Sequence, residues 1–187
     1  MNWNRIAEEY LAVADEIVGT MAPTVDSIAE TIATQLRAGF KVMACGNGGS
    51  AADAQHLAGE LVNRFLKDRK PYAGIALSTD TSVLTAIGND YGYGLTFEKQ
   101  VVALGKKGDV LIAISTSGNA ENVCRAVQEA KKIGVLTVGL TGGKGGRLAG
   151  LVDKALVVAA SSSTPRIQEG HQLIIHALCE RIEEILM

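Results

Sequence analysis

The sequence has few aromatic residues and no excess of charge of either sign. Aromatic residues make up 4% of the 187, and 18 Lys and Arg stand against 20 Asp and Glu. Nucleic-acid-binding proteins present basic surfaces or aromatic stacking platforms, so this composition predicts no nucleic-acid partner. At 47% hydrophobic and 20% charged, the composition also excludes a disordered chain.

Cysteine is scarce, and long hydrophobic runs are absent. Cys45, Cys124 and Cys179 stand far apart in apolar surroundings without a CxxC pair. We therefore predict three buried thiols and neither a disulfide framework nor a thiolate zinc site. No apolar run approaches the roughly 20 residues of a membrane span, and acidic residues interrupt the first apolar stretch, unlike a signal peptide. We expect a soluble, cytoplasmic protein with no membrane partner.

Short apolar runs alternate with helical patterns along most of the chain. Residues 1–40 carry two apolar stripes at helical spacing and predict a pair of helices separated at Pro23. Five continuous apolar runs in residues 41–187 predict strands of a parallel sheet covered on both faces; they occupy 41–45, 73–77, 109–114, 135–140 and 155–159. We predict one α/β domain over 1–187, with a doubly wound, flavodoxin-like core and the helical pair outside it or on another subunit.

Two loops rich in small polar residues follow the first and third predicted strands. Gly46-Asn-Gly-Gly-Ser50 and Ser115-Thr-Ser-Gly-Asn119 each lead into a helix. Ligands bind doubly wound sheets at such strand ends, and a helix N-terminus offers N–H groups and a positive dipole end to a phosphate. Neither loop is a Walker A or GxGxxG motif. The pair favours a sugar phosphate over a nucleotide, with ordinary turns as the alternative.

Ionisable residues stand on two of the predicted helices. His56 and Glu60 are four residues apart, which places them on one helix face among small and apolar neighbours. His176 lies in a last helix that is apolar almost all round, where a histidine needs a partner. These residues are either a solvated pair and a satisfied core histidine, or one catalytic or metal centre.

These segments together resemble the sugar isomerase (SIS) domain family. The matching stretches are 46–50, 54–61, 88–90, 108–119, 140–142 and 166–169, with His176. The resemblance implies an aldose–ketose isomerase that converts sedoheptulose 7-phosphate to D-glycero-D-manno-heptose 7-phosphate through an enediol. Such a reaction supplies heptose precursors for lipopolysaccharide and other surface glycans.

The resemblance also implies roles for individual residues. Glu60 and His176 would be the acid–base pair, and one zinc ion per subunit would be held by His56, Glu60, Gln168 and His176. Substrate contacts would come from Asn47, Gly48, Gly49, Ser50, Glu60, Asn89, Asp90, Ser115, Thr116, Ser117 and Gln168. Two departures from the family pattern are Ala120, where relatives often have Ser, and Pro165, where they often have an acidic residue.

The family assembles as a homotetramer with sites between subunits, and the resemblance implies the same here. Gln168 and His176 are eight residues apart, about 12 Å of helical rise. Both reach one metal only if Gln168 lies at a non-helical start or the ligands come from different subunits. The rival function is a non-catalytic SIS-domain regulator of replication initiation that binds the initiator protein. Such adaptors are expected to lack the equivalents of Glu60 and His176, so this chain favours the isomerase.

Overall fold

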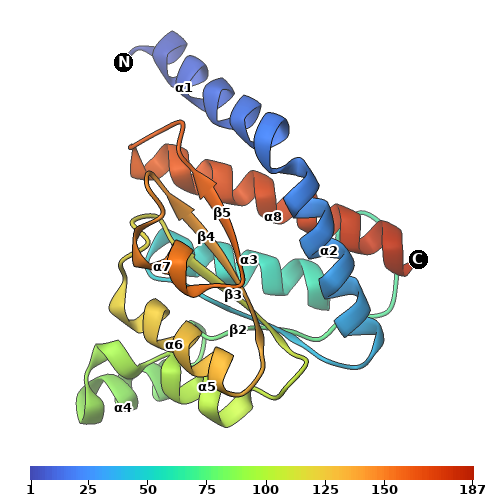
Figure 1. The fold of residues 1–187 in the computed structure, drawn as a ribbon, viewed down its shortest axis with the longest axis vertical. Coiled ribbons are helices and arrows are strands. Elements are labelled where there is room, and N and C mark those ends of the chain that lie inside the picture. Colours follow the sequence, from blue (N-terminus) through green and yellow to red (C-terminus); the bar gives the residue numbers. More distant parts are fainter.

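The computed structural model describes residues 1–187 as a five-stranded sheet between two layers of helices (Figure 1). The strands are β1 (Val42–Cys45), β2 (Gly74–Ala76), β3 (Val110–Ser115), β4 (Leu136–Gly142) and β5 (Lys154–Val158). All pair in parallel, in the order β2-β1-β3-β4-β5. This confirms the predicted flavodoxin-like arrangement. Every residue of β1 and β3 is buried, which explains their unbroken apolar sequences.

The two helical layers differ in the size of the core beneath them. α2 (Ala22–Arg37), α3 (Gly49–Val62) and α8 (Thr164–Leu186) cover one face of the sheet (Figure 1), over a core of 27 buried residues. The other face carries α5 (Glu98–Leu104), α6 (Glu121–Lys132) and α7 (Gly146–Leu151), over a core of 14. α3 and α8, which carry the ionisable residues, therefore rest on the larger core. No helix combines the length and apolar character needed to cross a bilayer.

The two N-terminal helices are present, but the predicted break between them is wrong. α1 (Trp3–Glu16) continues through a π-helical segment, Ile17–Met21, into α2 as one long helix (Figure 1). Pro23 lies in the first turn of α2, where a missing N–H is tolerated. The wider π turn before it changes the hydrogen-bonding pattern without ending the helix.

Two helices lie where the sequence interpretation placed none. α4 (Thr81–Tyr91) has no fully buried residue. Its few apolar residues, Val83, Leu84 and Ile87, stand in a stretch rich in Thr, Ser and Asn that the sequence interpretation did not assign to a helix. Its start is marked only by Asp80, whose carboxylate accepts a hydrogen bond from the Val83 N–H at 2.9 Å. α7 is six residues long, too short for a periodic pattern.

His171 on α8 is part of the core rather than of a catalytic cluster. It is fully buried, and its Nε2–H donates to the carbonyl oxygen of Thr141 at 3.1 Å. Its Nδ1 has no partner. Burial lowers the pKa of His171 to about 4, although the bond to Thr141 acts in the opposite direction. The neutral imidazole is therefore the form that the fold accepts.

This buried histidine predicts a fold that weakens in mild acid. The pKa of His171 is about 4 in the folded protein and about 6.5 in an unfolded chain. As pH falls below 6.5 the unfolded state binds more protons, so this contribution to stability is complete above 6.5 and is lost on approach to 4. Between pH 7 and pH 5 the loss amounts to about 2 kcal/mol.

Urea denaturation of wild type and His171→Gln at both pH values measures this contribution. The glutamine amide can still donate to Thr141 but does not titrate. The acid-induced loss of unfolding free energy should be smaller in the variant by about 2 kcal/mol. Equal losses in the two proteins would show that His171 does not set the acid sensitivity.

Candidate functional site

The two small polar loops lie next to each other at the carboxyl edge of the sheet. β1 and β3 are hydrogen-bonded neighbours, although α3, β2, α4 and α5 separate them in the sequence. Their loops lead into α3 and α6 at the point where the strand order reverses. Doubly wound proteins bind ligands at such a reversal.

The β3 loop opens onto a hollow of about 290 Å³, here called the hydroxyl hollow. It is lined by Thr116, Ser117, Gly142, Gly143, Lys144, Ser162, Thr164 and Ile167. Hydroxyl groups from two segments, a lysine ammonium and the N-terminus of the 23-residue helix α8 converge there. The N-cap residue Ser163 makes no side-chain bond to the first turn. This is an arrangement suited to an anion such as a phosphate ester.

Part of this hollow was missed from the sequence. Lys144, Ser162 and Thr164 were not singled out, although the run Ser161-Ser-Ser-Thr164 before the last helix was a usable signal. Gly118 brings the walls together. It has a φ of +66°, and a Cβ there would collide with the backbone of Gly145.

In the β1 loop, the Asn47 side chain is hydrogen-bonded to other side chains of the same chain. The Asn47 side chain forms a reciprocal amide pair with Asn122, both bonds being 2.9 Å, and accepts a hydrogen bond from the Tyr93 hydroxyl at 2.9 Å. Gly48 has a φ of +56°, and Ser50 is buried in the first turn of α3.

The remaining predicted substrate contacts lie apart from one another. Ser115 is buried at the end of β3. Asn89 and Asp90 are exposed near the end of α4, where the Asn89 amide donates to Asp90 at 2.8 Å. Neither of these two residues lines the hydroxyl hollow or belongs to the ionisable cluster on α3 and α8.

The structure brings three predicted residues into one cluster, here called the His–Glu–His cluster: His56, Glu60 and His176. His56 and Glu60 project from α3, with His56 Nε2 3.0 Å from Glu60 Oε1. His176 projects from α8, and its Nε2 lies 3.0 Å from His56 Nε2. The ligand atoms of all three lie within 4.8 Å of one another. The fold therefore brings together His56 and His176, which are 120 positions apart in the sequence.

Two glutamines of α8 occupy different places. Gln172, which the sequence interpretation missed, donates its amide to His176 Nε2 at 2.8 Å. The spacing of four residues on one helix was a usable signal. Gln168 packs against Gly49 in the β1 loop, where a Cβ would clash with its amide. Gln168 thus lies outside the His–Glu–His cluster in this chain.

The donor set of the cluster is chemically suited to a metal ion. Imidazole and carboxylate are zinc ligands, and tetrahedral ligands at 2.0–2.1 Å from zinc lie about 3.3 Å apart. The two separations of 3.0 Å are close to this value. His56 is 43% exposed and Glu60 23% exposed, so small molecules can reach them. The cluster could therefore hold a metal ion or transfer protons.

A buried carboxyl group lies on α3 one turn before His56. Asp53 is 9% exposed, and its Oδ2 has no hydrogen-bond partner. Burial raises the pKa of Asp53 to about 6, and the nearby His56 partly offsets the rise. The sequence interpretation did not single out this residue.

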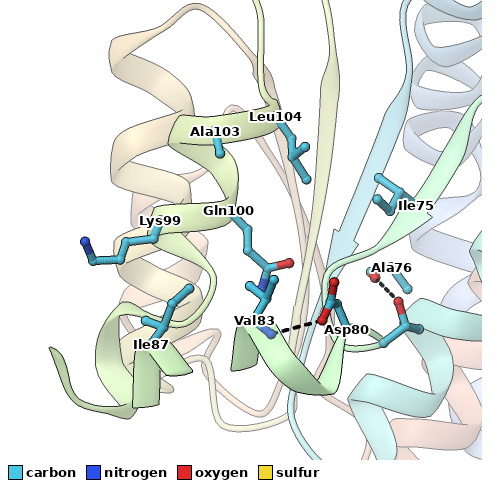
Figure 2. Close-up of a pocket in the computed structure, with 10 residues that line it drawn as sticks. Ile75, Ala76, Asp80, Val83, Ile87, Lys99, Gln100, Ala103 and Leu104 are labelled. Atoms are coloured by element: carbon cyan, nitrogen blue, oxygen red, sulfur yellow. Dashed lines mark hydrogen bonds between the residues drawn. The ribbon is translucent and has the colours of Figure 1, made fainter. Parts of the chain in front are cut away.

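A second hollow, of about 370 Å³, lies at the β2 edge of the sheet (Figure 2). β2, α4 and α5 supply its mainly apolar lining, including Ile75, Val83 and Leu104. Its polar groups already have partners: Asp80 caps α4, and Gln100 donates to the Leu77 and Thr96 carbonyls. This hollow therefore holds no group of histidine and carboxylate side chains like the one on α3 and α8.

Comparisons with known proteins agree with this geometry. Residues 7–142 match the SIS domain family. The chain is 63% identical over 144 residues to a phosphoheptose isomerase of Nitratiruptor sp., covering 77% of this chain and 76% of that one. Solved phosphoheptose isomerases from Neisseria gonorrhoeae (TM-score 0.87, 46% identity) and Francisella tularensis (TM-score 0.92, 39% identity) each match over 97% of this chain and 96% of theirs. The chain therefore belongs to the SIS domain family and, within it, to the phosphoheptose isomerases.

Proposed function

We propose that this protein converts sedoheptulose 7-phosphate to D-glycero-D-manno-heptose 7-phosphate, supplying heptose for surface glycans. The observation that carries the proposal is the His–Glu–His cluster, whose ligand atoms lie within 4.8 Å of one another, with His56 Nε2 3.0 Å from both Glu60 Oε1 and His176 Nε2. The similarity to named phosphoheptose isomerases supports the substrate class. The cluster also favours the isomerase over a regulator of replication initiation, because such an adaptor has no use for it.

The proposed reaction moves protons between C1 and C2 of the sugar. Glu60 removes the proton from C1 of the ketose while His176 delivers a proton to the carbonyl oxygen at C2, which forms an enediol. Return of a proton to C2 and removal of the proton from the C1 oxygen then give the aldose. Gln172, which donates to His176 Nε2 at 2.8 Å, holds the imidazole in place.

The hydroxyl hollow is proposed to bind the phosphate of the substrate. Ile167, which lines it, precedes His176 by nine residues on α8, about 13 Å of helical rise. This separation supports a site in which a neighbouring subunit completes the contacts. The other proposed substrate contacts, Asn89 and Asp90, are exposed and free to face such a neighbour.

Exposed apolar surface supports the proposed homotetramer. Trp3, Leu11 and Val18 are 57–70% exposed and are spread over about 22 Å of the N-terminal helix. A groove next to them is lined by Ile17, Val18, Ala22, Val25, Asp26, Leu173 and Ala177. Leu173 and Ala177 lie within one turn of His176 on α8, and we propose that a subunit covering this groove also approaches the His–Glu–His cluster.

We propose zinc as the metal of the cluster, one per chain. His56, Glu60 and His176 would hold it, with Gln168 as the fourth ligand that the family pattern implies. Bound zinc would polarise the substrate carbonyl. It would also occupy the atoms that Glu60 and His176 need for proton transfer, so the zinc site and the metal-free acid–base pair are alternative states of the cluster. Gln168 packs against Gly49 here, so its participation requires its side chain to turn away from the β1 loop.

Removing either member of the acid–base pair should abolish most turnover. Glu60→Gln and His176→Ala should each lower kcat by at least about 100-fold, the usual effect of losing a positioned acid or base. A coupled assay with sedoheptulose 7-phosphate measures this, and circular dichroism checks the fold. Glu129→Gln, a like change on α6, should leave kcat unchanged. Near wild-type turnover in either cluster variant would remove that residue from the mechanism.

Weakening the hydroxyl hollow should impair binding more than chemistry. Thr116→Ala and Ser117→Ala should raise KM more than they lower kcat, because phosphate contacts serve the ground and transition states alike. Ser82→Ala on α4 is the matched control. Unphosphorylated sedoheptulose should be a very poor substrate, and equal turnover of the two sugars would show that the hollow does not bind phosphate.

Zinc should stabilise the assembled protein. At a zinc concentration 100 times Kd, unfolding should cost about 2.7 kcal/mol more, visible as a higher Tm. His56→Ala should weaken this effect while leaving the tetramer intact in sedimentation, because apolar surface rather than the ion holds the subunits together. A monomer at working concentration would contradict the assembly, and activity unaffected by chelator together with no bound zinc would contradict the metal.

A further inference from the structure

A buried ion pair holds the connection between α3 and β2. Residues 63–73 contain no helix or strand. Within them Arg69 is paired with Glu183 of α8, Nε to Oε1 at 3.1 Å, and the two side chains are 5% and 3% exposed. Neither residue belongs to the His–Glu–His cluster or to the hydroxyl hollow. Buried ion pairs add little stability compared with apolar packing, so stability alone does not account for this pair.

The Glu183 carboxylate binds the start of this connection to α8. It accepts hydrogen bonds from the backbone N–H groups of Phe65, Leu66 and Lys67 at 3.3, 3.0 and 2.9 Å. Burial alone would raise the pKa of Glu183, but these three bonds and Arg69 outweigh it, and the pKa lies below its usual range. Glu183 is therefore a carboxylate at neutral pH, and both of its oxygens accept hydrogen bonds. A neutral side chain such as glutamine, with one acceptor oxygen, could accept only some of them.

The Arg69 guanidinium closes the C-terminal end of α3. It donates to the carbonyl oxygens of Glu60 at 2.7 Å and Leu61 at 3.0 Å, both in the last turn of a helix that ends at Val62. Carbonyls there have no donor within the helix, and a cation is favoured by the helix dipole. Arg69 thus connects the backbone of a cluster residue to Glu183.

The same connection reaches His176 from the other side. Glu183 follows His176 by seven residues, two turns along the same face of α8. The ring of Phe65, whose N–H is bound by Glu183, lies 5.6 Å from the His176 ring, centroid to centroid. Both halves of the cluster are therefore tied to one ion pair.

We propose that Arg69 and Glu183 are positioning residues, whose ion pair sets the spacing of α3 and α8 at which the His–Glu–His cluster binds metal or transfers protons. This rests on the function proposed above. A purely structural pair would affect stability alone and leave the folded protein with normal metal affinity and normal kcat.

Three variants of the full-length protein separate these roles. Glu183→Gln keeps the shape of the side chain but removes its charge. Arg69→Lys keeps a charge but loses the fork that reaches two carbonyls and a carboxylate together; it is the milder change should Glu183→Gln fold poorly. The control is Asp109→Asn. This buried carboxylate binds Lys41 and the Lys106 N–H at the amino end of β3, away from the cluster.

Zinc titration against a chelator, and kcat and KM for sedoheptulose 7-phosphate, are measured below the Tm of each variant. Glu183→Gln and Arg69→Lys should each raise the Kd for zinc roughly tenfold, the lower end of what loss of an outer partner costs a metal site. Each should also lower kcat with little change in KM. Asp109→Asn should lower Tm while leaving both Kd and kcat near wild type.

Wild-type Kd and kcat in the folded variants would overturn the positioning role, as would equal losses in Asp109→Asn. Failure of the proposed function looks different. If the wild type binds zinc but does not isomerise the sugar, the Kd for zinc of the variants still tests the positioning role. If the wild type isomerises the sugar without zinc, the kcat of the variants tests it. A wild type that does neither overturns both proposals.

Discussion

The packing of α3 against α8 is the constraint on which the rest of the site depends. α3 supplies His56 and Glu60 one turn apart, and α8 must bring His176 to 3.0 Å from His56 and within 4.8 Å of Glu60. A shift of either helix by a fraction of a turn would separate these groups. The large core beneath both helices and the Arg69–Glu183 pair at their far ends resist such a shift.

The proton-transfer groups and the anion-binding groups of the site lie on different kinds of structural element. Carboxylate and imidazole groups, whose mutual geometry governs proton transfer, stand on helices. The anion-binding groups stand in loops and at a helix start, where Thr116 and Ser117 offer hydroxyls and α8 offers unpaired N–H groups. Phosphate binding tolerates small displacements better than proton transfer does, so the distribution suits an isomerase of sugar phosphates.

Much of this arrangement could be predicted from the sequence. β1 and β3 are buried on both faces and read as continuous apolar runs, and His56 and Glu60 share a face by spacing alone. Sequence interpretation missed α4, whose apolar residues Val83, Leu84 and Ile87 are only half-buried. It could not predict the uninterrupted N-terminal helix, which depends on a local π turn. The four-residue spacing of Gln172 and His176 could have identified their contact from the sequence. Gln168, eight residues before His176, was expected beside it only because the family resemblance implied it.

The central claim is that Glu60 and His176 act as one unit. A double-mutant cycle on kcat/KM for sedoheptulose 7-phosphate tests it most directly, using Glu60→Gln, His176→Ala and the double variant. Residues that act in one proton-transfer step are strongly non-additive. If the two residues act as one unit, the kcat/KM of the double variant should be no lower than that of the less active single variant. Losses that multiply would contradict it and show that the two side chains contribute independently.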